Sequence, residues 1–223
     1  MPRKQTALIT GASRGIGEAI AKLFILNNIE VLMPTRQEMD LSDNDSIDKY
    51  ISLIDKPIDI LVNNAGINNI EEIQKLSDKN IVETLQINLV SALRLTRELS
   101  KQMLLQKYGR IVNISSIWSV VSKPGRSIYS ISKEGLNALS RSLAVELAKD
   151  NILINSVAPG FVNTELTKKN NSEKVLKTIA QNIPAQRLAE PTEIAELVYF
   201  LCSSKNTYLT GQTILIDGGY TCQ

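Results

Sequence analysis

The chain has 223 residues, of which 43% are hydrophobic and 22% charged, and its formal net charge is +2. This length is typical of one domain with a sizeable core, and the scattered lysines and arginines give no reason to expect nucleic acid or an anionic membrane as a partner. The lack of histidine and the presence of only two cysteines exclude Ser-His-Asp and Cys-His catalysis, an imidazole-based metal site and a disulfide framework.

The N-terminal segment MPRKQTALIT contains no apolar signal core, and no apolar run in the chain approaches the roughly 18 residues of a membrane span. We therefore expect a cytoplasmic protein. Acid–base chemistry must be carried by Tyr, Lys, Asp, Glu or Cys, because no imidazole is available.

Short apolar runs alternate with longer segments of helical period. The predicted strands are Thr6–Thr10, Glu30–Met33, Ile58–Val62, Arg110–Ile114, Leu153–Val157 and Thr213–Ile216. The predicted helices are Gly15–Asn27, Asp43–Ile54, Lys79–Gln106, Ser127–Lys149 and Pro191–Ser203. This alternation, with several strands continuously apolar, predicts one α/β domain over residues 1–223 whose parallel sheet is covered by helices on both faces.

The segment TALITGASRGIGEAIAKLF is typical of a strand, a glycine-rich turn and a helix. Gly11 allows a sharp turn at the strand end, and Gly15 and Gly17 allow backbone and helix to approach a ligand closely. The first turn of the helix offers free N–H groups and the positive end of its dipole to a pyrophosphate. The segment therefore favours nucleotide binding over a simple turn.

The spacing Gly-x-x-x-Gly-x-Gly resembles that of the short-chain dehydrogenase/reductase family, in its classical type. Further matching motifs follow in the family's order, namely NNAG (Asn63–Gly66), IN (Ile87-Asn88), NISS (Asn113–Ser116), YSISK (Tyr129–Lys133), APG (Ala158–Gly160) and TGQTILIDGG (Thr210–Gly219). The resemblance implies a Rossmann-type doubly wound parallel sheet and an NAD(P)(H)-dependent oxidoreductase that interconverts carbonyls and alcohols. The C-terminal part is most similar to 3-oxoacyl-(acyl-carrier-protein) reductases.

Tyr129 and Lys133 are four residues apart on a predicted helix and therefore share one face. An ordinary tyrosine, with a pKa of about 10, is a poor base at neutral pH, and a nearby ammonium lowers that pKa. Taken alone, such a pair is more often an exposed surface feature. The resemblance implies that Tyr129 is the general acid/base and that Lys133 lowers its pKa and holds the nicotinamide ribose. It also implies that Ser116 binds the substrate oxygen, with Ser115 a structural neighbour, and that Asn88 completes a proton relay.

The resemblance further implies a cofactor site that draws on several loops of the sheet. Asn64–Gly66 line the adenosine side in this arrangement, and Pro159–Thr164 wrap the nicotinamide end. The implied cofactor-binding residues are Gly11, Ser13, Arg14, Gly15, Ile16, Gly17, Thr35, Arg36, Asp40, Leu41, Asn64, Ala65, Gly66, Tyr129, Lys133, Pro159, Gly160, Val162 and Thr164.

The segment VLMPTRQEMDLSD bears on the choice of cofactor. NAD-selective members usually carry an acid about 18 residues after the last glycine of the first turn, and this position is the neutral Thr35. Arg36 follows and can pair with a 2′-phosphate, which favours NADP(H). NAD(H) remains open, because Arg36 could be an exposed turn residue and Glu38 lies close by.

The same segment departs from the family pattern. Only Gln37, Glu38 and Met39 separate Arg36 from Asp40-Leu41, the pair that contacts adenine in relatives. The helix that usually lies between them is therefore expected to be deleted, which leaves one flank of the sheet thinner.

A small-molecule carbonyl or alcohol substrate is expected between the loop after Ser116 and a short lid near residues 164–187. Trp118 and Val120 could form apolar walls there, or pack internally. A 3-oxoacyl thioester and a sugar-derived or other small ketone both remain open as substrates. A non-catalytic NADP(H)-binding sensor is the alternative of another class, and enoyl reductases usually space the tyrosine and lysine further apart. Relatives commonly form tetramers through two long helices and the C-terminal strand, so a homo-oligomer, tetramer or dimer, is expected.

Overall fold

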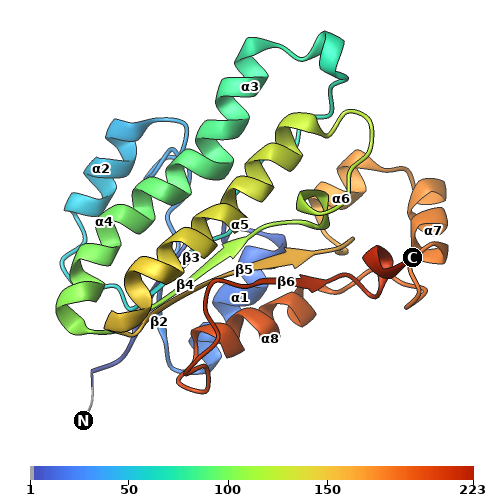
Figure 1. The fold of residues 1–223 in the computed structure, drawn as a ribbon. Helices are drawn as coiled ribbons and strands as arrows, with labels where there is room; N and C mark the ends of the chain where they lie inside the picture. Colours follow the sequence, from blue (N-terminus) through green and yellow to red (C-terminus); the bar gives the residue numbers. More distant parts are fainter. Residues whose placement is uncertain (1–2) are drawn as a thin grey trace.

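The computed structural model describes residues 3–223 and contains one parallel sheet with helices on both faces (Figure 1). Its strands are β1 (Thr6–Ile9), β2 (Glu30–Leu32), β3 (Ile60–Asn63), β4 (Gly109–Ile114), β5 (Ile152–Pro159) and β6 (Thr213–Ile216). Their order in the sheet is β2-β1-β3-β4-β5-β6, and every neighbouring pair is parallel. The Rossmann-type prediction is confirmed, with strand ends that differ from the expected ones by a residue or two.

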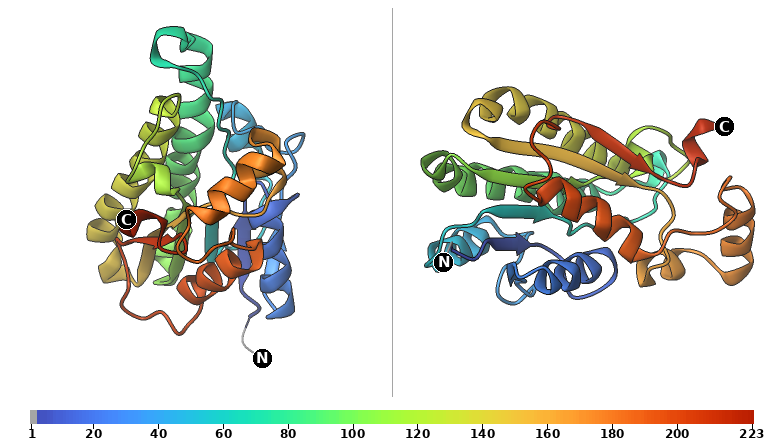
Figure 2. Two further views of the ribbon diagram at one scale, coloured as in Figure 1. Left: turned by 90° about the vertical axis from the view of Figure 1, so that its right-hand side faces the viewer. Right: turned by 90° about the horizontal axis from the view of Figure 1, so that it is seen from below.

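The helices form two layers. α1 (Gly15–Leu26) and α8 (Pro191–Cys202) pack together on one face, whereas α2 (Asn44–Ser52), α4 (Ser91–Gln106) and α5 (Ser127–Leu147) cover the other (Figure 1). α3 (Asp78–Leu85) extends the line of α4. The short α6 (Glu165–Asn170) and α7 (Glu173–Gln181) lie beyond one end of the sheet (Figure 2). Within residues 3–223, no helix is both long and apolar enough to cross a membrane.

Side chains that alternate along each strand contribute to two apolar cores, one on each face of the sheet. On β1, Ala7 and Ile9 pack with Phe24 of α1, and Leu8 between them packs with Leu95 of α4 on the opposite side. Because successive side chains of a strand point to opposite faces, a continuously apolar strand buries both faces. The sheet is therefore a rigid platform for the loops at its ends.

The chain after β2 is shorter than in a standard Rossmann sheet. No helix lies between β2 and Asp40, and a tight turn, in which Met39 N donates to Thr35 O at 2.9 Å, brings Met39 into the core. The predicted deletion is confirmed, and it extends further than expected, because β2 is also the edge strand. Loss of strand 3 and its helix from the usual order 3-2-1-4-5-6 leaves an order that matches β2-β1-β3-β4-β5, and the observed sheet carries β6 as a further strand beside β5.

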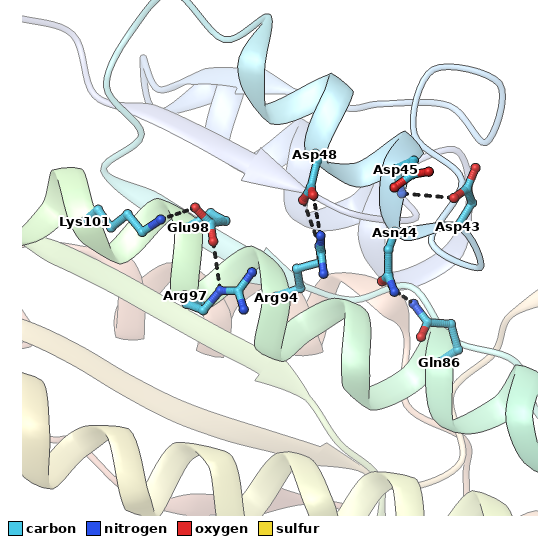
Figure 3. A network of polar contacts seen from close by, with 9 residues as sticks. All are labelled: Asp43, Asn44, Asp45, Asp48, Gln86, Arg94, Arg97, Glu98 and Lys101. Atoms are coloured by element: carbon cyan, nitrogen blue, oxygen red, sulfur yellow. Dashed lines mark hydrogen bonds and ion pairs between the residues drawn. The ribbon is translucent and has the colours of Figure 1, made fainter.

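Contacts between α2 and α4 hold the flank that lacks this helix (Figure 3). Arg94 pairs with Asp48 through two hydrogen bonds, one of them 2.7 Å from Nε to Oδ1. Gln86 donates from Nε2 to Asn44 Oδ1 at 3.0 Å and to Leu41 O at 3.2 Å. These contacts fix the loop that carries Leu41 to the long helical segment at the centre of the chain.

The predicted continuous helix Lys79–Gln106 is wrong in one respect. A π-helical stretch, Gln86–Val90, separates α3 from α4, and Asn88 lies in it. Such a turn widens the helix by one residue and often marks a functional position. The hydrophobic period that predicted the helix carries no signal for this insertion.

Candidate active site

A cavity of about 670 Å³ opens at the carboxyl ends of the strands. Its walls come from the loops after β1, β2, β3, β4 and β5 and from the first turns of α5. This is where open α/β sheets bind ligands, and the volume is in the range of ligand pockets.

Nearly all the residues predicted for the cofactor and the chemistry meet in this cavity. Gly17 and Asn88 are the exceptions, and both lie directly behind its wall. The predicted residues that line it are Gly11, Ser13, Arg14, Gly15, Ile16, Thr35, Arg36, Asp40, Leu41, Asn64, Ala65, Gly66, Ser116, Tyr129, Lys133, Pro159, Gly160, Val162 and Thr164.

The glycine-rich turn needs its glycines for two different reasons. Gly11 and Gly15 have φ values of 65° and 60°, a region that disfavours a side chain. Gly17 is required for packing, because a Cβ there would lie 2.4 Å from Asn64 Nδ2 and from Gly11 O. Asn64 Nδ2 donates to Thr10 O and Gly11 O at 2.9 and 3.0 Å. Gly17 thus lets the ends of β1 and β3 approach each other, whereas the sequence predicted contact with a ligand.

The start of α1 offers a site for an anion. Its N-cap residue, Arg14, has an extended backbone and provides no side-chain cap, so the first N–H groups of the helix remain available to a ligand at the cavity wall. Free N–H groups and the helix dipole both favour a phosphate there. The residues present therefore fit the pyrophosphate of a dinucleotide cofactor.

The loop after β2 arranges its charges in a defined way. Glu38 accepts hydrogen bonds from Thr35 N and Oγ1 at 2.7 and 2.9 Å, which lower the pKa of its carboxyl. Arg36 donates from Nε to Asp40 Oδ2 at 3.1 Å, and its side chain is 74% exposed. Glu38 is thus turned toward Thr35, and the Arg36 guanidinium remains accessible at the cavity.

Lys133, Ser115 and Ser116 are held by the end of β4. Lys133 is buried and donates from Nζ to Ile114 O at 2.8 Å, while Ser115 Oγ donates to Lys133 O at 3.0 Å. Ser116 Oγ accepts from Trp118 N at 3.2 Å and faces the cavity with Tyr129. Both serines line the cavity, but Ser115 Oγ is bonded to the backbone of α5, whereas Ser116 Oγ accepts a hydrogen bond from the following loop; the role expected of Ser116 stays a prediction.

Asn88 contacts the backbone behind the cavity. Its Nδ2 donates to Ile67 O at 2.9 Å and to Ser132 Oγ at 3.0 Å, and its Oδ1 accepts from Ile67 N at 2.8 Å. A Cβ on Gly66 would lie 3.3 Å from both Asn88 Oδ1 and Lys133 Nζ, so the three residues converge. The π turn places this amide between the loop after β3 and α5.

Burial is the largest influence on the pKa values of Tyr129 and Lys133. It raises the pKa of the Tyr129 phenol, while a hydrogen bond with Ser116 and the nearby Arg126 charge lower it. Burial lowers the pKa of Lys133 to about 8. Lys133 is not among these influences on the pKa of Tyr129; its Nζ lies 5.7 Å from the ring centroid and donates to Ile114 O, and its expected effect on the phenol stays a prediction. Ser116 and Arg126 act on Tyr129 instead.

The substrate side of the cavity is partly apolar. Trp118 lines it and packs edge-on against Phe161, with ring centroids 6.0 Å apart, so Trp118 is both a wall and a packing residue. Val120 is exposed and is not part of the wall, so its predicted role there is wrong. Of the expected lid, the first part up to Asn171 lines the cavity and α7 does not.

Sequence reasoning missed Arg126 and Asn68, which also line the cavity. Arg126 is the N-cap residue of α5 and lies just before the predicted helix, so the helical period gave no signal for it. Asn68 lies in an irregular loop and has no periodicity that could predict it. Within residues 3–223, no group of three or more metal-ligating side chains is found.

Comparison with known proteins identifies similar chains over nearly the full length. A family model described as "Enoyl-(Acyl carrier protein) reductase" matches residues 30–221. A 3-oxoacyl-[acyl-carrier-protein] reductase of Rickettsia typhi is 39% identical over 96% of each chain, and nodulation protein G of a Rhizobium species is 38% identical over 96% of this chain and 95% of that protein.

Solved structures agree with these sequence matches. A 4-hydroxyisoleucine dehydrogenase in complex with NADH and succinate superimposes with a TM-score of 0.93 at 31% identity, covering 98% of this chain and 99% of that one. An NADPH-dependent reductase of bacilysin biosynthesis, YwfH, has a TM-score of 0.90 at 25% identity, covering 98% of each chain.

Proposed function

The chain belongs to the short-chain dehydrogenase/reductase family of oxidoreductases, and from this premise we propose that its cavity catalyses hydride transfer between a nicotinamide cofactor and a carbonyl or alcohol carbon. The observation that carries the proposal is the meeting of Ser116, Tyr129 and Lys133 at one cavity wall, with Asn88 directly behind it. A protein that only binds the cofactor has no need of a partly buried phenol and a buried ammonium beside its ligand.

The side chains have distinct roles in this proposal. The nicotinamide, when bound, supplies or accepts the hydride. Tyr129 donates a proton to the oxygen of a carbonyl as it is reduced, and accepts one from an alcohol in the reverse direction. Ser116 donates a hydrogen bond to the same oxygen and stabilises the charge that develops on it.

Lys133 and Asn88 support Tyr129 from behind. Lys133 contacts the ribose of the cofactor, and its pKa of about 8 lets it gain or lose a proton near neutral pH. Asn88 is bonded to Ile67 and to Ser132, which joins the loop after β3 to α5 near Tyr129. Asn88 is thus proposed to complete a proton relay while holding the loop after β3.

We propose NADP(H) as the preferred cofactor, with Arg36 as the partner of the 2′-phosphate. The accessible guanidinium supports this choice, as does the Glu38 carboxylate, which is turned toward Thr35. Asp40 and Leu41 contact the adenine side in this arrangement, and the Gln86 contact to Leu41 O holds them in place without the usual helix.

Replacing Arg36 by aspartate tests this assignment. The ratio of kcat/KM for NADPH over NADH should fall by about 100-fold or more, because a bidentate attraction for the phosphate becomes a repulsion. Steady-state kinetics with both cofactors measure the ratio, and Arg97→Asp, a change of the same charge on exposed α4, serves as the control. Unchanged NADPH affinity in Arg36→Asp contradicts the role of Arg36.

Two substrate classes have specific support. The similar 3-oxoacyl-[acyl-carrier-protein] reductases favour a 3-oxoacyl thioester, and the similar 4-hydroxyisoleucine dehydrogenase favours a small ketone or alcohol, sugar-derived or otherwise. A screen of cofactor oxidation over acetoacetyl thioesters, crotonyl thioesters, simple ketones and keto-sugars separates them. Consumption with crotonyl thioesters alone would identify an enoyl reductase and overturn the proposal.

A homo-oligomer, tetramer or dimer, is also proposed. Leu93 and Leu105 of α4, Val145 of α5 and Leu215 of β6 are all exposed, on the elements that relatives use for assembly. Light scattering after size-exclusion chromatography tests this, and a mass near 24.6 kDa, that of one chain, would overturn it.

A further inference from the structure

Arg126 is a buried arginine that faces the active-site cavity. Arg126 is 6% exposed, and it lines the cavity together with Tyr129. The guanidinium carbon lies over the Trp118 ring, 5.5 Å from its centroid, within the range of a cation–π contact. The Arg126 backbone is fixed by the start of α5, where Ser130 N donates to Arg126 O at 2.8 Å. The position of this charge is therefore set by the fold.

The guanidinium of Arg126 lacks the partners that a buried arginine requires. Its Nε and Nη1 are buried and have no hydrogen-bond partner within residues 3–223, and none of the ion pairs among those residues involves it. Taking a charge out of water without a partner is costly, and burial accordingly lowers the pKa of Arg126. Buried polar groups in native proteins normally have hydrogen-bond partners, so the unpaired Arg126 nitrogens call for another explanation.

The other buried arginine of the chain shows the contrast. Arg110 is 3% exposed, and its terminal nitrogens donate to Gly109 O and Asn151 O at 2.8 and 2.9 Å and to Asn206 O at 3.2 Å. Its Nε has no partner among the described residues, but both of its terminal nitrogens are bonded, whereas Arg126 lacks partners at Nε and at Nη1. Arg110 joins three segments and faces no ligand cavity. Arg126 makes no such contacts within the described residues, and it lines the cavity of about 670 Å³, where an anionic ligand would supply the partner that it lacks.

We propose that Arg126 binds a free carboxylate of the substrate, so that the protein acts on short oxo acids and hydroxy acids. This inference rests on the proposed hydride transfer and names the substrate class of that same site. Arg126 is the N-cap residue of α5 and lines the same cavity as Tyr129, which lies in the first turn of that helix. A carbonyl at Tyr129 and a carboxylate at Arg126 therefore belong to one small molecule. The planar guanidinium matches a carboxylate through two parallel hydrogen bonds.

The same geometry discriminates against thioesters. A 3-oxoacyl thioester presents a neutral sulfur and acyl oxygen where the proposed substrate has a carboxylate, so the Arg126 charge stays unpaired in its complex. Trp118 and Phe161 close this side of the cavity with an apolar wall, which excludes water from the ion pair and strengthens it. Selectivity therefore arises because the Arg126 charge is paired in the complex with an acid and unpaired in the complex with a thioester.

Paired substrates test the proposal. The panel is 2-oxobutanoate, acetoacetate and levulinate, each with its methyl ester, together with the neutral acetoacetyl-N-acetylcysteamine and with acetoacetyl-CoA. In the wild type, kcat/KM for at least one acid should exceed that for its ester by about tenfold or more. In Arg126→Gln this acid-to-ester ratio should fall by about 30-fold or more, because one partner of a buried charge pair is removed.

Matched variants separate charge recognition from folding. Arg126→Lys should retain part of the acid-to-ester ratio, because lysine keeps the positive charge but cannot form two parallel hydrogen bonds to a carboxylate. Lys123→Gln removes an exposed charge from the same loop and should leave the ratio as in the wild type. Arg126→Met should melt at or above the wild-type temperature, because an unpaired buried charge is replaced by an apolar chain. A lower melting temperature for Arg126→Met would show a structural arginine and overturn the proposal.

Binding without turnover distinguishes this inference from the proposed function. Trp118 is the only tryptophan of the chain, and it contacts Arg126, so its fluorescence reports on the occupant of the guanidinium. Acetoacetate added to the complex of Tyr129→Phe with cofactor should change this fluorescence. Its methyl ester should leave the fluorescence unchanged at the same concentration. If acids bind in this way and no substrate is turned over, the proposed function fails and the Arg126 site stands. If esters or thioesters are turned over at least as well as acids, the carboxylate proposal fails and the proposed function stands.

Discussion

Replacing Tyr129 by phenylalanine is expected to lower kcat by about 10³-fold, within the range that positioned acid–base catalysis contributes. The substitution removes a single oxygen and keeps the ring, which lies beside Lys133 and Ser116 at the cavity wall. Because the phenol is the proposed proton donor, hydride transfer then leaves an alkoxide whose proton can come only from water. Steady-state kinetics in the reducing direction measure the loss.

Two measurements accompany this variant. Cofactor titration of Tyr129→Phe establishes that the dinucleotide still binds and that the loss belongs to the chemical step. Tyr208→Phe, which makes the same change at a residue that is 94% exposed, should retain full activity. Residual activity of Tyr129→Phe within tenfold of the wild type would remove the proposed acid/base role from Tyr129.

Replacing Lys133 by methionine is expected to lower kcat/KM by about 100-fold and to change the pH dependence of stability. The pKa of Lys133 in the folded protein is about 8, against a usual value of 10.5. Between these values the unfolded chain binds more protons than the folded one, so the stability of the wild type rises with pH in this window. Burying the charged Lys133 ammonium lowers the stability of the folded protein, and this cost is fully present below pH 8, where it amounts to about 3 kcal/mol.

The difference in unfolding free energy between Lys133→Met and the wild type isolates this effect. At pH 7 the variant should be at least as stable as the wild type, because it lacks the buried charge and loses one hydrogen bond to Ile114 O. Between pH 8 and pH 10 the unfolding free energy of the wild type should rise relative to that of the variant. Urea unfolding at pH 7 and pH 10 measures both, with Lys149→Met as an exposed-lysine control. A difference that does not change with pH would contradict the buried charge of Lys133.

Local sequence signals predicted most of the fold and many of the proposed site residues. Alternating apolar runs identified the strands, because burial on both faces leaves a continuous apolar pattern. The motifs around Gly11, Ser116 and Tyr129 predicted side chains and turns that meet at one edge of the sheet, because parallel strands bring their carboxyl ends together. The spacing from Arg36 to Asp40 also predicted the missing helix.

The features that were not predicted depend on contacts between distant segments. In the π turn, the Asn88 amide bonds to both backbone groups of Ile67, a contact that no helical period reveals. The packing role of Gly17 depends on Asn64, which follows a different strand. Arg126 belongs to the same class, because its missing partners become visible only when the surrounding elements are in place.

The central claim is that this cavity transfers a hydride and does not merely hold a dinucleotide. It is tested most directly with NADPH deuterated at one or the other C4 position, incubated with the best ketone or oxo acid of the screen, followed by mass and NMR analysis of the alcohol. The account predicts that deuterium from one C4 position only appears at the carbinol carbon, and that Tyr129→Phe slows its appearance by about 10³-fold. Bound cofactor with no deuterium in any product would contradict it and would leave a cofactor-binding protein without catalysis.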